Sequence, residues 1–297
     1  MSRSFPALDV AWGLRPDDEA VERMLAEIDD ERPTAWEARA DGVRIFFTST
    51  DDRRRAAIRL TGFESGLTCT PVNVPDEEWA ERSQASLDPV RVAGIVVSPP
   101  WRADDATRLA SEATPPARVV LIQPSMGFGT GHHATTRLCL DLLQRRDLTG
   151  ARVLDIGTGS AVLAIAAWRL GARDVDAADR DADALQSAAE NIALNGAEGA
   201  VRLRLVDLDA GDDALGPPGR FDLVLANLTG ATLDRFAGLL ARLVSPGGAL
   251  IVSGFEAHEE AGVRQAFEAV RAVPVDRAEE HGWIALRLTI PSGSTAS

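Results

Sequence analysis

The feature that most constrains the fold is the stretch RVLDIGTGSAVLAI, residues 152–165, in which a short glycine-containing turn joins two apolar segments. The first segment is typical of a buried parallel strand, and the second is typical of a buried helix. Small residues between them allow a tight turn and let a ligand reach the N–H groups at the start of the helix. The stretch therefore predicts a doubly wound α/β sheet with a nucleotide-type ligand at this turn.

The spacing of the small residues distinguishes two classes of cofactor. The dinucleotide fingerprint requires a glycine three positions after Gly159, and the chain has Val162 there. The turn that binds S-adenosylmethionine requires small residues at three alternate positions, which are Gly157, Gly159 and Ala161 in this chain. We therefore expect Gly157 and Gly159 to bind S-adenosylmethionine.

Acidic residues stand at the ends of the predicted strands. Asp179 ends DVDAAD, where its two oxygens could accept both ribose hydroxyls, although it could instead cap the next helix. Asp207 ends the following strand and could accept from the adenine amino group, a role for which Asp209 competes. Asp155 precedes the turn, and we place it in the cofactor site as the residue that orients the turn from behind.

Asn227 ends the fourth strand, in LVLANLTG. A side-chain amide at this position lies beside the methyl donor, where it can accept from an attacking amine and donate to the cofactor. The alternative is an asparagine that only forms the turn. We expect Asn227 to bind the cofactor and to be the catalytic residue.

The motif GFGTGHHATT, residues 127–136, contains two adjacent histidines before an apolar helix. A metal site needs at least three ligands, and no third histidine, cysteine or acidic cluster lies nearby in the sequence. We therefore expect no metal at His132 and His133. Thr135 or Thr136 is the predicted N-cap of the helix that follows.

The chain divides into four parts by pattern. Residues 1–74 have the order β-α-β-β-α-β of a small α+β ferredoxin-like domain, and residues 75–117 form a proline-rich connector with one strand at RVAGIVVSP. Residues 118–290 alternate strands and helices and end in two strands that should form an antiparallel hairpin at the sheet edge. Residues 291–297 form a polar tail that we expect to be disordered.

Composition limits the partners of the protein. The 297 residues have a formal net charge of −14, and all 31 basic residues are arginine. Such a chain should repel nucleic acid and attract a basic protein. No apolar run is long enough to span a membrane, and two cysteines in apolar patterns suggest reduced thiols. We expect a cytoplasmic monomer.

Four motifs resemble the PrmA family, the methyltransferases of large-subunit ribosomal protein eleven. They are DEEWAERSQASLDPVRV, FGTGHHATTRLCL, VLDIGTGSAVLAIAAWRLGA and ANLTG, within a resemblance that covers about residues 76–288. The resemblance implies a class I S-adenosylmethionine-dependent methyltransferase domain with a Rossmann-like fold. It also implies that the glycine loop folds over the cofactor, which adds Phe128, Gly129, Thr130 and Thr136 to the binding residues.

The chain departs from the family pattern near this loop. The family has Thr-His-Pro where this chain has His132-His133-Ala134, and a glycine where it has Ala161. It also has Asp-Pro-Gly in place of residues 123–125 and Ile in place of Leu228. These differences concern the entrance for the substrate more than the binding of the cofactor.

The resemblance implies transfer of a methyl group to amino groups of a ribosomal protein, on lysine side chains and possibly the N-terminus. Three alternatives remain at this point. A methyltransferase of nucleic-acid bases would need an Asn-Pro-Pro-aromatic motif and a basic face, whereas this chain has NLTG after the strand. A methyltransferase of another protein or small molecule, and a non-catalytic protein that binds S-adenosylmethionine, both fit the same residues.

Overall fold

The structure is a computed structural model, and its chain separates into two compact units, Met1–Leu87 and Asp88–Ser297. The described residues are 4–11, 21, 24–25, 27–28, 31, 33–39, 41–63, 66–75, 87–124, 133–210 and 215–292. No helix within these ranges is both long and apolar enough to cross a membrane.

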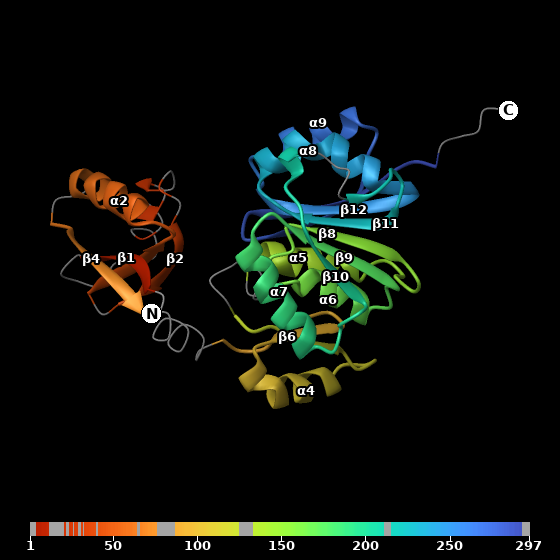
Figure 1. Cartoon of the computed structure of the whole chain (residues 1–297), viewed down its shortest axis with the longest axis horizontal. Coiled ribbons are helices and arrows are strands. Elements are labelled where there is room, and N and C mark those ends of the chain that lie inside the picture. The colour runs from red at the N-terminus through yellow and green to blue at the C-terminus, as the bar shows by residue number, and fades with distance from the viewer. Residues whose placement is uncertain are drawn as a thin grey trace. The chain divides into compact units, whose positions relative to one another are not determined.

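The first unit contains a four-stranded antiparallel sheet (Figure 1). Its strands have the order β2-β3-β1-β4, which is the ferredoxin-like arrangement predicted for this part of the chain. Its elements are β1 Ser4–Ala11, β2 Pro33–Ala38, β3 Gly42–Phe47, α2 Thr50–Phe63 and β4 Thr68–Pro75. Val21, Met24 and Leu25, from the helix predicted between β1 and β2, are helical.

Side chains that alternate along β1 and β3 build the core of this unit. Leu8 and Ile45 pack with the helical residues Met24 and Leu60 in the main cluster. Gly42 is required by a close approach of backbones, because a Cβ there would lie 1.9 Å from the carbonyl oxygen of Val10.

The second unit is built on a seven-stranded sheet of order β10-β9-β8-β11-β12-β14-β13. The first five strands in this order are parallel, and β14 pairs antiparallel with both β12 and β13, so the predicted hairpin at the sheet edge is confirmed. The strands are β8 Arg152–Ile156, β9 Asp174–Asp179, β10 Val201–Leu205, β11 Phe221–Asn227, β12 Val244–Glu256, β13 Val273–Glu280 and β14 Trp283–Thr289.

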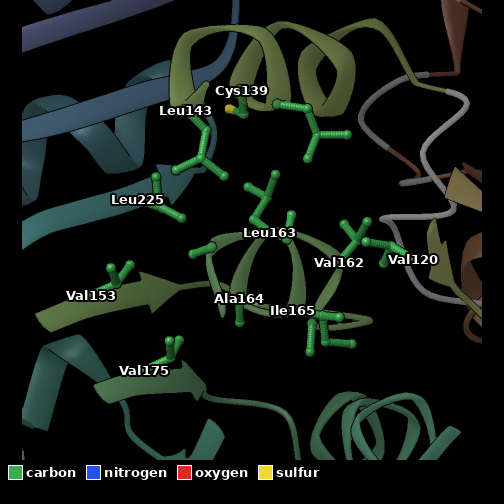
Figure 2. Packing of buried hydrophobic residues seen from close by; sticks show 14 of the residues in the cluster. Val120, Cys139, Leu143, Val153, Val162, Leu163, Ala164, Ile165, Val175 and Leu225 are labelled. Atoms are coloured by element: carbon green, nitrogen blue, oxygen red, sulfur yellow. The ribbon is translucent and has the colours of Figure 1, made fainter. Parts of the chain in front are cut away.

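Helices cover both faces of this sheet (Figure 1). They are α5 Ala134–Leu143, α6 Val162–Arg169, α7 Ala182–Leu194, α8 Gly230–Leu243 and α9 Glu260–Ala269. Val153 of β8 belongs to the cluster on the side of α5, α6 and α7, and its neighbour Leu154 belongs to the cluster with α8 and α9. Figure 2 shows Cys139 and Leu143 of α5 near Leu163 of α6. The arrangement confirms the predicted α/β class with a Rossmann-like sheet.

The boundary between the two units falls inside the predicted connector, residues 75–117, because the second unit begins at Asp88. The strand predicted at RVAGIVVSP is wrong in detail, because it is a hairpin that turns at Ala93 with a φ of 48°. Its strands join β7 in a three-stranded sheet apart from the large one. The elements are β5 Val90–Val92, β6 Ile95–Ser98, η2 Pro100–Arg102, α4 Ala103–Ser111 and β7 Arg118–Leu121.

Candidate cofactor and methyl-transfer site

The candidate site lies where the central strands end. β8 is flanked by β9 on one side and by β11 on the other. The strands before and after this point are therefore added to the sheet in opposite directions, outward from β8. Ligands of open α/β sheets bind at this reversal, outside the carboxyl ends of the strands. Asp179 and Asn227 are the last residues of β9 and β11, so the fold brings both predicted side chains to the same edge.

The turn after β8 has a backbone that favours small residues. Gly157, Gly159 and Ala161 have φ values of 69°, 52° and 65°, in the left-handed region. The N–H groups of Gly157 and Thr158 both donate to the carbonyl oxygen of Ala178, at 2.9 and 3.0 Å. A Cβ at Gly157 would lie 2.4 Å from Leu228 Cδ2. Ala161 therefore adopts a conformation that a glycine adopts at lower cost, which explains the family's glycine at this position.

Asp155 holds this turn from the interior. Its Oδ2 accepts from the Thr158 hydroxyl at 2.7 Å and from the Ala164 N–H at 3.2 Å. Burial raises the pKa of the Asp155 carboxyl to about 7. The two hydrogen bonds act in the opposite direction and lower the pKa, while the nearby Asp179 raises it by a smaller amount. These contacts support the orienting role expected for Asp155.

Asp179 is tied to the same turn. One carboxylate oxygen accepts from the Gly159 N–H at 3.0 Å, and the other accepts from the Asp181 N–H at 3.0 Å. The helix α7 is capped by Asp181, whose side chain accepts from the Asp183 N–H. The alternative that Asp179 is the helix cap is therefore wrong, and its carboxylate stays beside the glycine turn.

Asn227 contacts the start of α5. Its Nδ2 donates to Thr135 Oγ1 at 3.2 Å, which links the fourth strand to the second half of the GFGTGHHATT motif. The predicted cap of α5 is wrong, because the N-cap is His133, whose Nδ1 accepts from the Thr135 N–H at 3.3 Å. Thr136 is buried in the first turn of the helix.

The two acids after β10 have different surroundings. Asp207 is exposed and accepts from the Asp209 N–H at 3.0 Å. Asp209 forms an ion pair with Arg235 of α8 at 2.5 Å. Because the carboxylate of Asp209 already has a cation partner, Asp207 is the better candidate for the adenine contact.

Several predicted residues lie outside the described part of the chain. They are Phe128, Gly129, Thr130 and His132, so the binding roles of the first three and the expectation of no metal at His132 stay predictions. Among the described residues, no group of three or more His, Cys, Asp or Glu side chains is placed to hold a metal ion.

Two contact-forming asparagines, one within α7 and one at its C-cap, were not predicted from the sequence. The Asn191 side chain accepts from the Gln123 N–H at 2.7 Å and donates to the Ser160 carbonyl oxygen at 3.1 Å. Asn195 pairs in the same way with the N–H and the carbonyl oxygen of Leu121. These contacts join the chain before the GFGTGHHATT motif to the glycine turn. Their only signal in the sequence is the spacing of two asparagines four apart on a helix.

Comparisons with known proteins agree with this geometry. The family model "Ribosomal protein L11 methyltransferase (PrmA)" matches residues 12–290. A ribosomal protein L11 methyltransferase from Geobacter sulfurreducens is 43% identical over 285 residues, which cover 92% of this chain and 88% of that protein. Another from Geobacter metallireducens is 34% identical over 264 residues, covering 85% and 83%.

A solved structure also matches. The ribosomal protein L11 methylase of Lactobacillus delbrueckii subsp. bulgaricus has a TM-score of 0.58 and 26% identity, over 69% of this chain and 98% of that chain. The predictions of a methyltransferase and of S-adenosylmethionine as its cofactor are thereby confirmed, and the chain belongs to the ribosomal protein L11 methyltransferase family, PrmA.

Proposed function

We propose that the enzyme transfers methyl groups from S-adenosylmethionine to amino groups of ribosomal protein L11, in the cytoplasm and as a monomer. The observation that carries the proposal is the meeting of Asp179, the glycine turn and Asn227 at one edge of the sheet, in a chain 43% identical to a named L11 methyltransferase. Lysine side chains are the expected acceptors, together with the N-terminus.

The described residues fit the cofactor. The turn from Gly157 to Ala161 leaves the cofactor room to approach the backbone, and Asp179 offers carboxylate oxygens to the ribose hydroxyls. Asp207 is the proposed acceptor for the adenine amino group, and Thr136 belongs to the same set by family resemblance. When bound, the cofactor supplies an electrophilic methyl group.

Asn227 is proposed to orient the attacking amine. A lysine amine has a pKa of about 10.4 in water and must be neutral to attack, and burial in the site lowers that pKa. The amide oxygen of Asn227 can accept from an amine N–H and align the nitrogen lone pair. No tyrosine exists in the chain to act as a base, so alignment and exclusion of water are the proposed contributions of the protein.

The proposed acceptor is a protein and not a nucleic acid. The net charge of −14 favours the approach of a basic protein and disfavours a polyanion. The ferredoxin-like domain, residues 1–74, is proposed to recognise the substrate. A variant without residues 1–87 should keep its affinity for S-adenosylmethionine and lose methylation of L11.

The test is methyl transfer by the purified full chain to purified L11, followed by peptide mass spectrometry. We expect methylated amino groups in L11 with the wild type and at least a hundredfold slower transfer with Asn227→Ala, the order found when an aligned polar group is removed. Binding of the cofactor without any transfer to L11 would contradict the proposal. Methylation of a different protein in a cell extract would mean that L11 is not the substrate, although the enzyme would still be a protein methyltransferase.

A further inference from the structure

Beyond the binding residues, a hydrogen-bond chain runs from the cap of α5 to the proposed catalytic amide. We infer that His133 is a positioning residue that fixes which end of the Asn227 amide faces the substrate, through the hydroxyl of Thr135. The inference rests on the proposed function, in which the amide oxygen of Asn227 accepts from the attacking amine.

The direction of the chain follows from its hydrogen bonds. His133 Nδ1 accepts from the Thr135 N–H at 3.3 Å and lies 2.8 Å from Thr135 Oγ1. A ring nitrogen that accepts from a backbone N–H has no proton, so the proton of the neutral ring is on Nε2. The Thr135 hydroxyl must then donate to Nδ1, and this uses its single proton.

Asn227 is left with one way to pair. Because the Thr135 hydroxyl donates its single proton in the hydrogen bond to His133, its oxygen can only accept from Asn227. The amide must therefore turn its Nδ2 toward Thr135, at 3.2 Å, and its Oδ1 away from it. The result is an acceptor held ready for an amine N–H, with no charged base involved.

The surroundings keep the His133 ring in place and neutral. The edge of the ring packs on Trp283 of β14, with centroids 4.9 Å apart and planes at 68°. Burial and the nearby Arg137 of α5 lower the pKa of His133 below its ordinary value of 6.5, while Glu280 of β13 raises it by less. Arg137 forms an ion pair with Glu280 at 2.6 Å, and His281 is a further titratable neighbour of Glu280.

Protonation of His133 would reverse the direction of these hydrogen bonds. The Nδ1–H group would donate to Thr135 Oγ1, and the Thr135 N–H would lose its acceptor. The Thr135 hydroxyl would then donate to Asn227, whose amide would turn its Oδ1 toward Thr135 and away from the amine. Transfer should therefore depend on neutral His133, in addition to the neutral amine of the substrate.

The pH dependence of transfer tests this directly with His133→Asn, whose amide oxygen can cap the helix but does not titrate. The ratio of the wild-type kcat to the kcat of this variant cancels the titration of the substrate amine. We expect the ratio to be constant above pH 7 and to fall about tenfold per pH unit below the pKa of His133. A ratio that stays flat through the pH range in which the ring shifts show His133 taking up its proton would overturn the inference. His258→Asn, at an exposed turn, is the matched control and should keep the wild-type profile.

The role of the hydroxyl is tested at Thr135. Thr135→Val should lower kcat about tenfold or more while the Kd for S-adenosylmethionine changes less than threefold, since only the amide orientation is lost. Thr135→Ser keeps the hydroxyl and should recover most of the kcat. Equal kcat values for the Val and Ser variants would contradict the inference. Thr107→Val on α4 removes a hydroxyl that donates to the Ala103 carbonyl oxygen of its own helix, and serves as the control.

A measurement without turnover separates this inference from the proposed function. In the full chain labelled with 15N-histidine, the ring shifts of His133, assigned with His133→Asn, should report a neutral ring with its proton on Nε2 at pH 7.5. A proton on Nδ1 would overturn the inference whether or not the enzyme methylates L11. If the tautomer is as expected and no transfer occurs, the proposed function fails instead.

Discussion

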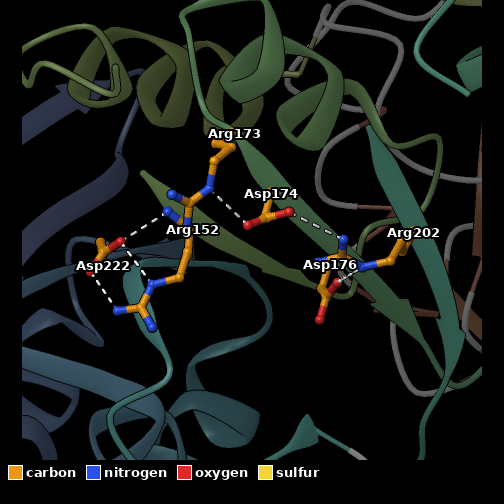
Figure 3. A network of polar contacts seen from close by, with 6 residues as sticks. All are labelled: Arg152, Arg173, Asp174, Asp176, Arg202 and Asp222. Carbon is orange, nitrogen blue, oxygen red and sulfur yellow. Dashed lines mark hydrogen bonds and ion pairs between the residues drawn. The ribbon is translucent and has the colours of Figure 1, made fainter. Parts of the chain in front are cut away.

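Aspartates play different roles at the two ends of the parallel strands, which are the amino edge, where the strands begin, and the carboxyl edge, where they end. At the amino edge, Asp222 of β11 pairs with Arg152 of β8 at 2.8 Å, and Asp174 of β9 pairs with Arg173 and Arg202 (Figure 3). At the carboxyl edge, Asp155 and Asp179 accept from backbone N–H groups and from a threonine hydroxyl. Within the described ranges neither of them has an arginine partner.

This difference separates stability from ligand binding. The side chain of Asp176 is fully buried and forms ion pairs with Arg202, Arg204 and Arg220 at 2.7, 3.0 and 2.8 Å. Its charge is balanced by the chain itself. Among the described residues, the carboxylate of Asp179 accepts only from two backbone N–H groups, and its oxygens can accept further hydrogen bonds, which suits a ligand rich in hydroxyl groups.

The largest effect should come from Asp176→Ala in the amino-terminal half of β9. Removing this carboxylate leaves three arginines without their shared partner, and we expect a loss of about 3 kcal/mol in the free energy of unfolding. Urea denaturation measures this loss. If the amino edge serves stability alone, the folded variant should bind S-adenosylmethionine as tightly as the wild type. A Kd raised more than threefold would contradict the division between the edges.

Asp179→Ala should have the opposite profile. Loss of two charge-assisted hydrogen bonds to the ribose should weaken binding about a hundredfold, or about 2.7 kcal/mol, as measured by isothermal titration calorimetry. Asp174→Ala makes the same change on the same strand at the amino edge and should leave the Kd unchanged. Equal affinity of Asp179→Ala and wild type would end the ribose assignment.

Gly157→Ala should disturb the carboxyl edge through the backbone. A Cβ at a φ of 69°, 2.4 Å from Leu228 Cδ2, should destabilise the fold by about 2 kcal/mol and weaken cofactor binding as well. Ala161→Gly is the comparison. At this position a glycine removes the strain of an alanine in the left-handed region. This gain offsets the loss of a buried methyl group and the greater conformational freedom of the unfolded chain, so the free energy of unfolding should change by less than about 1 kcal/mol. A thermal melt that ranks the two variants the other way would contradict the role of the turn.

The smallest effect concerns acid stability. Hydrogen bonds from the Arg152 side chain are the main reason that the pKa of Asp222 is lowered from 3.8 to about 2. A lowered pKa adds stability above the unfolded value, and this stability is lost as the pH falls from about 4 toward about 2. Asp222→Asn should therefore be less stable than wild type by about 1 kcal/mol at pH 6, after allowance for partial exposure, with a smaller difference at pH 3. A difference that grows on acidification would be contrary to this sign.

Much of the second unit could be predicted because its strands are continuous apolar runs that end in turn residues. The run before Gly157 and the polar residues 179 and 227 marked the carboxyl edge without any knowledge of contacts. The hairpin at 90–98 was missed because it turns at an alanine with positive φ, which no turn preference indicates.

Other features depend on contacts that sequence patterns do not contain. Two threonines, each a common N-cap, follow His133, yet the imidazole is the cap. The contacts of Asn191 and Asn195 join positions about 70 residues apart in the chain. The pairing of Asn227 with Thr135 is of the same kind, at a separation of 92 residues.

Amide hydrogen exchange of the full chain, with and without S-adenosylmethionine, tests whether the cofactor binds where the parallel strands end. We expect new protection at residues 157–161 and at the carboxyl ends of β9 and β11, with no change at the amino-terminal ends of β8, β9 and β11, where Arg152, Asp174 and Asp222 lie. Protection confined to the amino edge, or equal at both edges, would contradict this expectation.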